Sequence, residues 1–224
     1  MCASNRSLIG GFVYLSAADP VVALSASNPG RHRGHESLIR ATFSTVPAAD
    51  RPYPPQKLVP YEAAWAERYA VLARDLSRHL GAAWAIEHVG STSVPGLVAK
   101  PVIDLALSLP GGQELRDWTT AFRDIGWAGP VPTGDHQTFF LHDEGIRTAI
   151  AHVFTADQWP HAHLRLFADW LRTHPADQLA YARLKARLVR QGVWGSAYTE
   201  AKKEYVQGVV NRARAAKGLA AVTL

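Results

Sequence analysis

The residues best suited to phosphate chemistry gather in one segment, HVGSTSVPGLVAKPVIDLAL, which runs from His88 to Leu107. Glycine lets a backbone approach a phosphate closely, and the consecutive N–H groups of a turn form an anion-binding concavity. Hydroxyl groups add hydrogen-bond donors, and a lysine adds positive charge. The phosphate-binding candidates are Gly90, Ser91, Thr92, Ser93 and Lys100. The same residues also fit an ordinary Ser/Thr-rich turn followed by a second turn at Pro95-Gly96.

Asp104 lies in the apolar run 102–109, which the alternation of its side chains predicts to be a strand. A carboxylate inside such a strand is unfavourable unless it has a partner or a function. Mg²⁺ is commonly held by one or two carboxylates together with substrate phosphates, so Asp104 is the candidate metal ligand and a candidate catalytic residue. The alternative is a structural carboxylate that accepts hydrogen bonds from N–H groups of the preceding loop.

Histidines offer acid–base chemistry near this segment. His88 ends the first predicted strand beside the turn, and His152 lies in the last predicted strand. Either imidazole could transfer a proton or hydrogen-bond a phosphate, and either could instead hold a loop through a backbone hydrogen bond. His161 and His163 are two residues apart, and side chains at that spacing on a helix point apart, so this pair is not expected to bind a metal.

Hydrophobic spacing predicts the elements that must position these residues. Helices are expected over about 61–80, 115–125, 160–173, 176–191 and 198–216. Strands are expected over about 83–88, 102–109, 138–142 and 147–155, the last two as a hairpin. Four strands with one intervening helix, followed by three helices, predict an α+β domain that spans residues 57–217.

Residues 1–56 differ from the rest of the chain in composition. They are rich in Ala, Ser, Pro, Gly and Arg, show no sustained period, and end in the spacer Arg51-Pro-Tyr-Pro-Pro55. Such a composition predicts a mostly disordered N-terminal extension.

The overall composition limits the class of protein. Of 224 residues, 47% are hydrophobic and 19% are charged, which is typical of a globular domain with a hydrophobic core. The single cysteine, Cys2, excludes an internal disulfide. The net charge of +5 favours anionic ligands. The densest basic run, 185–190, is typical of a solvated helix face, so nucleic acid is not an expected partner. No apolar run reaches the roughly 20 residues that span a bilayer, and we expect a cytoplasmic protein without membrane contact.

The motif Glu87-His-Val-Gly-Ser-Thr-Ser-Val-Pro-Gly-Leu97, followed by Ala99-Lys-Pro-Val-Ile-Asp104, resembles the signature of the GrpB family, also called UPF0157. The resemblance extends from about Lys57 to Ala213 and includes Phe139-Phe140, His152-Val153 and Tyr198-Thr-Glu-Ala-Lys202. The family is grouped with the polymerase-β-type nucleotidyltransferase superfamily. Membership implies a nucleotidyltransferase-like mixed β-sheet with flanking helices and a C-terminal helical tail.

The resemblance also implies roles for individual residues. Gly90 and Ser91 match the turn that holds NTP phosphates in active nucleotidyltransferases, and Asp104 matches the first of the aspartates that hold Mg²⁺. The second acidic position falls at Ala106, and the strand that would carry the third offers His152. Two-metal catalysis is therefore not expected.

Tyr198 and Lys202 lie four residues apart, on one face of the last predicted helix. Taken alone, they would be a core tyrosine and a solvated lysine. Because the resemblance includes this pair, we expect it to close the pocket and to contact an anionic ligand.

Three functions follow from these observations. The first is binding of a nucleotide or a similar phosphorylated small molecule, with Mg²⁺-dependent nucleotidyl or phosphoryl transfer in which Lys100 or Lys202 stabilises the developing charge. The second is a binding or folding-assistance module without catalysis, since GrpB-like domains also occur fused to dephospho-CoA kinase. The third is a metal-independent enzyme that uses His88 and His152 as acid and base on an anionic metabolite.

Overall fold

The computed structural model describes residues 52–55 and 57–224. The predicted disordered extension falls almost entirely outside these residues and stays a prediction. Of its last residues, Pro52 and Tyr53 contact the domain. The carbonyl of Pro52 accepts a hydrogen bond of 3.0 Å from the backbone N–H of Arg147.

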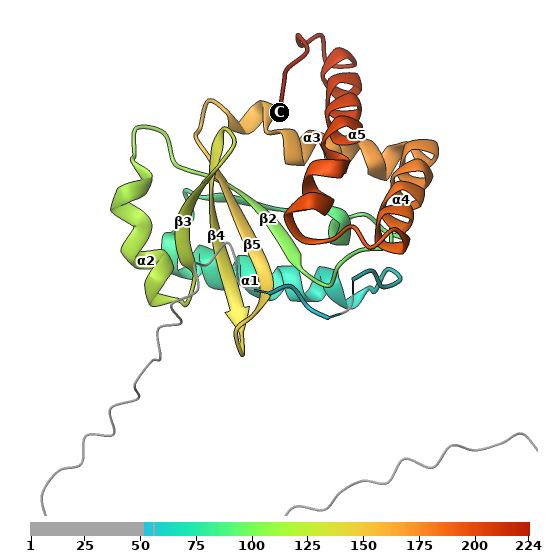
Figure 1. Ribbon diagram of the computed structural model, residues 1–224. Coiled ribbons are helices and arrows are strands. Elements are labelled where there is room, and N and C mark those ends of the chain that lie inside the picture. Colours follow the sequence, from blue (N-terminus) through green and yellow to red (C-terminus); the bar gives the residue numbers. More distant parts are fainter. Residues whose placement is uncertain (1–51, 56) are drawn as a thin grey trace, which may run out of the picture. The chain divides into compact units, whose positions relative to one another are not determined.

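A five-stranded mixed sheet forms the centre of the domain (Figure 1). Its strands are β1 (Ala85–Val89), β2 (Ile103–Ser108), β3 (Ala128–Thr133), β4 (His136–Asp143) and β5 (Ile146–Phe154). They lie in the order β1-β2-β5-β4-β3. Only the central pair, β2 and β5, is parallel, and its register places Asp104 opposite Ile150 and Ala106 opposite His152.

Helices flank the sheet and make up the C-terminal part of the chain. The α-helices are α1 (Ala64–Leu80), α2 (Thr119–Asp124), α3 (His163–Thr173), α4 (Pro175–Arg190) and α5 (Gly195–Ala215). Short 3₁₀ helices are η2 (Ser91–Ser93), η3 (Leu115–Trp118) and η4 (Trp159–His161). Figure 1 shows α1 and α2 beside the sheet and α3, α4 and α5 gathered together at the other side. This arrangement confirms the predicted α+β class with a mixed sheet, flanking helices and a helical tail.

The main core lies between the sheet and α1. Alternate residues of β2 point toward this helix, which supplies an apolar face of its own. The buried residues include Ile103, Leu105 and Leu107 from β2 and Trp65, Leu76 and Leu80 from α1. Because these residues of β2 face α1, Asp104 lies on the opposite face of the sheet.

A second core joins the three C-terminal helices to the loop that follows η2. Val94 and Leu97 of this loop are buried against Phe167 of α3, Tyr181 of α4 and Val209 of α5. The loop that carries the candidate phosphate turn is thereby fixed to the helical part of the domain.

The sequence prediction missed β3, the edge strand. Pro130 and Pro132 lie within it and cannot donate backbone hydrogen bonds, which is why its composition does not indicate a strand. An edge strand tolerates proline because one side of it needs no ladder partner. β3 and β4 form a hairpin through Gly134 and Asp135.

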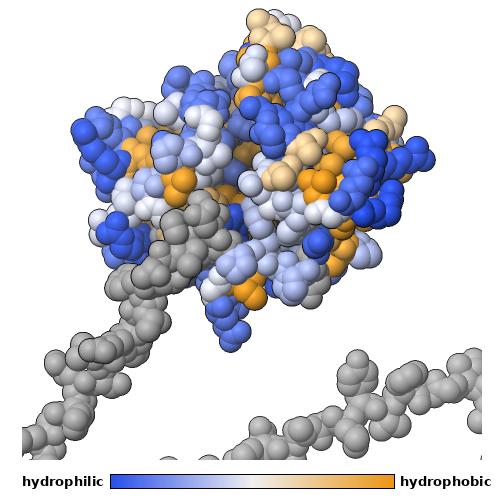
Figure 2. Space-filling view, viewed as in Figure 1, coloured by the Kyte–Doolittle hydropathy of each residue, from blue (hydrophilic) through white to orange (hydrophobic). Residues whose placement is uncertain are grey.

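In the part of the chain that the structure describes, no helix is long and apolar enough to cross a membrane. The face drawn in Figure 2 is mostly hydrophilic, with smaller hydrophobic areas between the charged and polar side chains.

Candidate functional site

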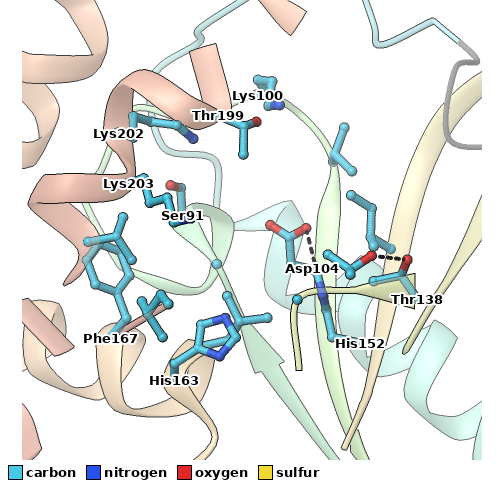
Figure 3. Close-up of a pocket in the computed structure, with 18 of the residues that line it drawn as sticks. Ser91, Lys100, Asp104, Thr138, His152, His163, Phe167, Thr199, Lys202 and Lys203 are labelled. Atoms are coloured by element: carbon cyan, nitrogen blue, oxygen red, sulfur yellow. Dashed lines mark hydrogen bonds and ion pairs between the residues drawn. The ribbon is translucent and has the colours of Figure 1, made fainter. Parts of the chain in front are cut away.

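A cavity of about 750 Å³ opens on the sheet face opposite α1. Asp104 of β2 and His152 of β5 line its floor, while the residues next to them, Leu105 and Val153, belong to the main core. Side chains of α3, α4 and α5 and of the turn between β3 and β4 form the walls. Figure 3 shows the labelled side chains of these elements converging around Asp104.

Gly90 and Asp104 are packed against each other at the start of the phosphate turn. Gly90 has φ +68°, a conformation that side-chain-bearing residues rarely adopt. A Cβ atom at this position would lie 2.1 Å from Oδ2 of Asp104, so the close approach also requires glycine. The turn then closes as η2, in which the Ser93 hydroxyl donates a hydrogen bond of 2.8 Å to the Gly90 carbonyl.

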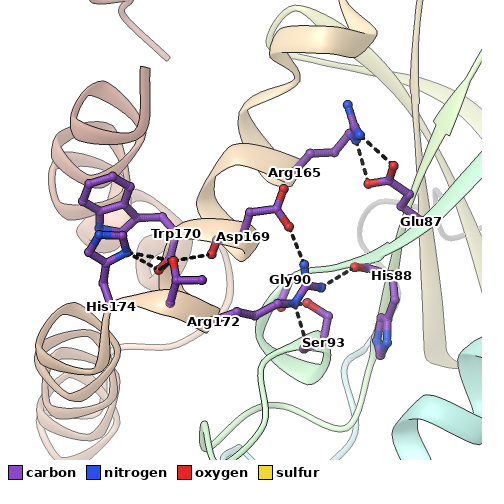
Figure 4. Close-up of polar contacts among 10 residues, drawn as sticks. Glu87, His88, Gly90, Ser93, Arg165, Asp169, Trp170, Arg172 and His174 are labelled. Carbon is purple, nitrogen blue, oxygen red and sulfur yellow. Dashed lines mark hydrogen bonds and ion pairs between the residues drawn. The ribbon is translucent and has the colours of Figure 1, made fainter. Parts of the chain in front are cut away.

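Two arginines of α3 hold this turn and β1 in place (Figure 4). Arg172 donates hydrogen bonds of 3.1 Å to the Ser93 carbonyl and 2.8 Å to the His88 carbonyl. Arg165 forms a two-pronged ion pair with Glu87 at 2.7 and 2.6 Å. Bidentate pairs of this kind fix geometry as well as adding energy, so α3 determines where the turn lies.

Three lysines surround the turn and Asp104. Lys185 of α4 donates hydrogen bonds to the Ser91 hydroxyl, at 3.0 Å, and to the Val98 carbonyl. Burial and then the charges of Lys202 and Lys100 lower its pKa well below the usual value. Burial, and then the charge of Lys202, lowers the pKa of Lys100 to about 8, although Asp104 opposes this shift. Burial likewise lowers the pKa of Lys202 to about 8.

Lys185 corrects one expectation. The run 185–190 was expected to form a solvated helix face, but Lys185 is only 2% exposed and points into the cavity. A lysine with this burial requires hydrogen-bond acceptors, which Ser91 and Val98 supply.

Aromatic rings contact Lys100, Lys202 and Arg147 through cation–π interactions. The Lys100 ammonium lies 3.7 Å from the centre of the Tyr53 ring, and the Lys202 ammonium lies 4.2 Å from that of Tyr198. The Arg147 guanidinium lies between the rings of Tyr53 and Phe140, at 4.5 and 4.3 Å. Cation–π contacts stabilise positive charge without neutralising it, so these groups keep their attraction for an anion.

The two predicted acid–base histidines occupy different places. His152 lies in the cavity, with Nε2 3.7 Å from Oδ1 of Asp104. The side chain of His88 does not line the cavity: its ring stacks on Tyr69 at 4.7 Å, and Nε2 contacts the Thr92 hydroxyl at 3.0 Å. Burial lowers the pKa of His88 to about 4. These contacts favour a structural role for His88.

The structure thus brings most of the predicted site residues together. Those that line the cavity are Gly90, Ser91, Thr92, Lys100, Asp104, His152, Tyr198 and Lys202. His88 and Ser93 lie outside the lining.

Sequence reasoning missed several residues that also line the cavity: Tyr53, Asp135, His136, Arg147 and Lys185. Asp135 and His136 follow strand β3, which the sequence prediction missed. If that strand had been predicted, Gly134-Asp135 would have indicated a hairpin turn. Arg147 begins a strand that was predicted, but nothing in the sequence indicates that it is buried.

Asp104 is the residue of this sheet face that could hold one Mg²⁺ ion. Its carboxylate faces the cavity, where substrate phosphates would complete the coordination. The next residue on the same face is Ala106, and the residue opposite Asp104 on β5 is Ile150, neither of which can bind a metal. Two-metal coordination does not fit these residues.

Comparison with known proteins identifies the family. Residues 55–212 match the GrpB protein family, and the chain belongs to it. A UPF0157 protein of Pseudomonas aeruginosa is 32% identical over 177 residues, which cover 71% of this chain and 68% of that protein. One from Halalkalibacterium halodurans is 33% identical over 164 residues, which cover 70% of this chain and 82% of that protein. Among solved structures, conserved protein GrpB from Enterococcus faecalis matches with a TM-score of 0.61 and 25% identity, covering 70% of this chain and 96% of that one.

Proposed function

We propose that this protein binds a nucleotide, or a similar phosphorylated small molecule, with its phosphates between the Gly90-Ser91 turn and Asp104. One observation carries the proposal: the Gly90-Ser91 turn, Asp104 and four lysines line one cavity of about 750 Å³. Cavities of this size are typical of small-molecule sites. The resemblance to the nucleotidyltransferase superfamily supports the same assignment of the turn.

The charges of the site favour a polyanion. Lys100 and Lys202 are held close together in partly buried positions, and each has its pKa lowered to about 8. A phosphate between them would relieve their mutual repulsion and raise both pKa values. Among the described residues, the lining has five cationic side chains (Lys100, Arg147, Lys185, Lys202 and Lys203) against three carboxylate side chains (Asp104, Asp135 and Glu200), so the site gains from a ligand with negative charge.

If the bound molecule reacts, the reaction we propose is nucleotidyl or phosphoryl transfer. Asp104 would hold a Mg²⁺ ion, which would neutralise charge on the phosphates. Ser91 would orient a phosphate oxygen through its hydroxyl, which Lys185 already contacts at 3.0 Å. Lys100 and Lys202 would stabilise the negative charge that develops during transfer.

The two alternatives receive less support. Acid–base catalysis by His88 and His152 requires both imidazoles in one pocket, and only His152 lines the cavity. A binding module without catalysis fits the same cavity and lysines and differs from the first function only in lacking transfer, whereas a folding-assistance module that binds no ligand would not need a cavity lined by lysines.

Calorimetric titration of the full chain with ATP, GTP, CTP, UTP and inorganic pyrophosphate, each with and without Mg²⁺, tests the proposal. We expect binding of at least one of these ligands and a loss of about tenfold or more in affinity for Lys202→Gln. Lys217→Gln is the matched control, because Lys217 is exposed and lies outside the cavity lining. Absence of binding would support a folding-assistance module without a nucleotide, and equal affinities for the two variants would contradict the placement of the phosphates beside Lys202.

A further inference from the structure

A second cluster of potential ligands lines the cavity on the side of the β3–β4 hairpin. Asp135, His136 and His163 each offer one atom to a common point, and these three atoms lie within 4.8 Å of one another. Oδ1 of Asp135 lies 3.1 Å from Nδ1 of His136 and 3.8 Å from Nδ1 of His163. His161, the expected neighbour of His163, belongs to η4 and takes no part.

These distances suit a tetrahedral ion with nitrogen and oxygen ligands. For Zn²⁺, with ligand bonds of about 2.0–2.1 Å, neighbouring ligand atoms are separated by about 3.3 Å. The two separations from Asp135, 3.1 and 3.8 Å, lie on either side of this value, and all three atoms lie within 4.8 Å of one another, so a small movement would bring them to the tetrahedral spacing. Two imidazoles and one carboxylate leave a coordination position open, as in catalytic zinc sites. Imidazole ligands favour Zn²⁺ and similar transition metals over Mg²⁺.

A buried nitrogen without a partner points to the same ion. Nδ1 of His163 is buried and has no hydrogen-bond partner among the described residues. A polar atom in this position is unfavourable unless something binds it. An ion between Asp135 and His136 would supply the missing partner.

The cluster is held in place without the ion. The Asp135 carbonyl accepts a hydrogen bond of 2.6 Å from the side chain of Gln158, which joins the hairpin turn to the segment after β5. The ring of His136 stacks on Phe154 at 4.5 Å. His163 is the first residue of α3, so the helix fixes its backbone. Ligands placed this firmly need little rearrangement to bind a metal.

The cluster is also connected to Asp104. Nε2 of His136 lies 2.9 Å from Nδ1 of His152. Nε2 of His152 lies 3.7 Å from Oδ1 of Asp104 (Figure 3). With an ion on its Nδ1, His136 would carry its proton on Nε2 and donate a hydrogen bond to Nδ1 of His152. His152 would then carry its own proton on Nε2, which faces Asp104. Metal-bound histidines commonly make such an outer hydrogen bond.

We propose that Asp135, His136 and His163 form a binding site for a divalent transition-metal ion of the Zn²⁺ class, with His152 as its link to Asp104. The site is separate from the Mg²⁺ position at Asp104 and does not depend on nucleotide binding. All three residues line the cavity, so an ion held by them would be accessible from it.

The test is a titration of the metal-free full chain with Co²⁺, whose visible absorption reports ligand number and geometry, followed by competition with Zn²⁺. We expect one Co²⁺ at this site, displaced by Zn²⁺. Asp135→Asn removes the negative charge from the ligand set and His163→Gln removes an imidazole ligand, so each should weaken this binding by about 10–100-fold or more, since changes to outer-shell partners alone have effects of that size. His161→Gln is the matched control and should bind as the wild type does.

The wild type and Asp135→Asn should unfold at the same temperature in chelator, because the Asp135 side chain is 61% exposed. Zn²⁺ should raise that temperature for the wild type alone. Equal Co²⁺ affinity for the wild type, Asp135→Asn and His163→Gln would overturn the proposal. So would a loss of binding in His161→Gln, or no Co²⁺ binding by the wild type.

Discussion

Replacing Gly90 with alanine tests the contact on which the phosphate turn depends. The new Cβ would lie 2.1 Å from Oδ2 of Asp104, and the backbone would have to keep φ +68°. Backbone strain of this kind costs about 1–3 kcal/mol. Asp104 cannot retreat easily because β2 is hydrogen-bonded on both sides, and overpacking costs about 1–3 kcal/mol more. We therefore expect Gly90→Ala to lower the free energy of unfolding by about 2–6 kcal/mol.

Gly112→Ala separates the two effects. Gly112 also has a positive φ, +76°, but a Cβ there would meet nothing within 4 Å. Gly112→Ala should lower the free energy of unfolding by the strain energy alone, about 1–3 kcal/mol, and should bind ATP as the wild type does. Urea denaturation gives the free energies of unfolding, and calorimetry gives the affinities. Equal destabilisation by both variants, with unchanged ATP binding by Gly90→Ala, would refute the role given to the Gly90–Asp104 contact.

Two further predictions concern pH. Affinity for a phosphate ligand should fall by about tenfold between pH 7 and 9, because Lys100 and Lys202, with pKa values of about 8, lose their charge over this range. Calorimetry should show a flatter profile for Lys202→Gln, and an unchanged profile would contradict the assignment. For His88, whose pKa is lowered to about 4, the folded protein binds the proton more weakly than the unfolded chain does. The free energy of unfolding should therefore fall as pH decreases from about 6.5 to 4, by up to about 1.4 kcal/mol per pH unit for this one group. Urea denaturation of His88→Gln should show a smaller slope, and a slope equal to that of the wild type would be inconsistent with this account.

Much of the fold and part of the site could be predicted from local patterns. The alternation of β2 places Asp104 on the face opposite the core, and this needs no knowledge of the other strands. The turn at Gly90 could be expected because glycine and hydroxyl residues favour turns, whether or not the turn binds phosphate. The five-residue strand β1 and the helices were recognised from their apolar spacing.

The rest depends on contacts between distant segments. Lys185 lies 94 residues from Ser91, and a lysine in a basic helical run gives no local sign that it is buried. His136 meets His163 only because the β3–β4 hairpin folds toward the start of α3, and β3 itself is obscured by its two prolines. His88 sits beside the turn in sequence, yet its ring packs on α1 rather than in the cavity.

The central claim is that Asp104 and the Gly90-Ser91 turn form a site for a phosphorylated ligand with Mg²⁺. The most direct measurement is a calorimetric titration of the wild type and of Asp104→Asn with ATP, each with and without Mg²⁺. We predict that the wild type binds ATP more tightly with Mg²⁺, and that Asp104→Asn loses this dependence while its circular dichroism spectrum stays that of a folded protein. Binding of ATP by Asp104→Asn with the affinity and Mg²⁺ dependence of the wild type would contradict the account.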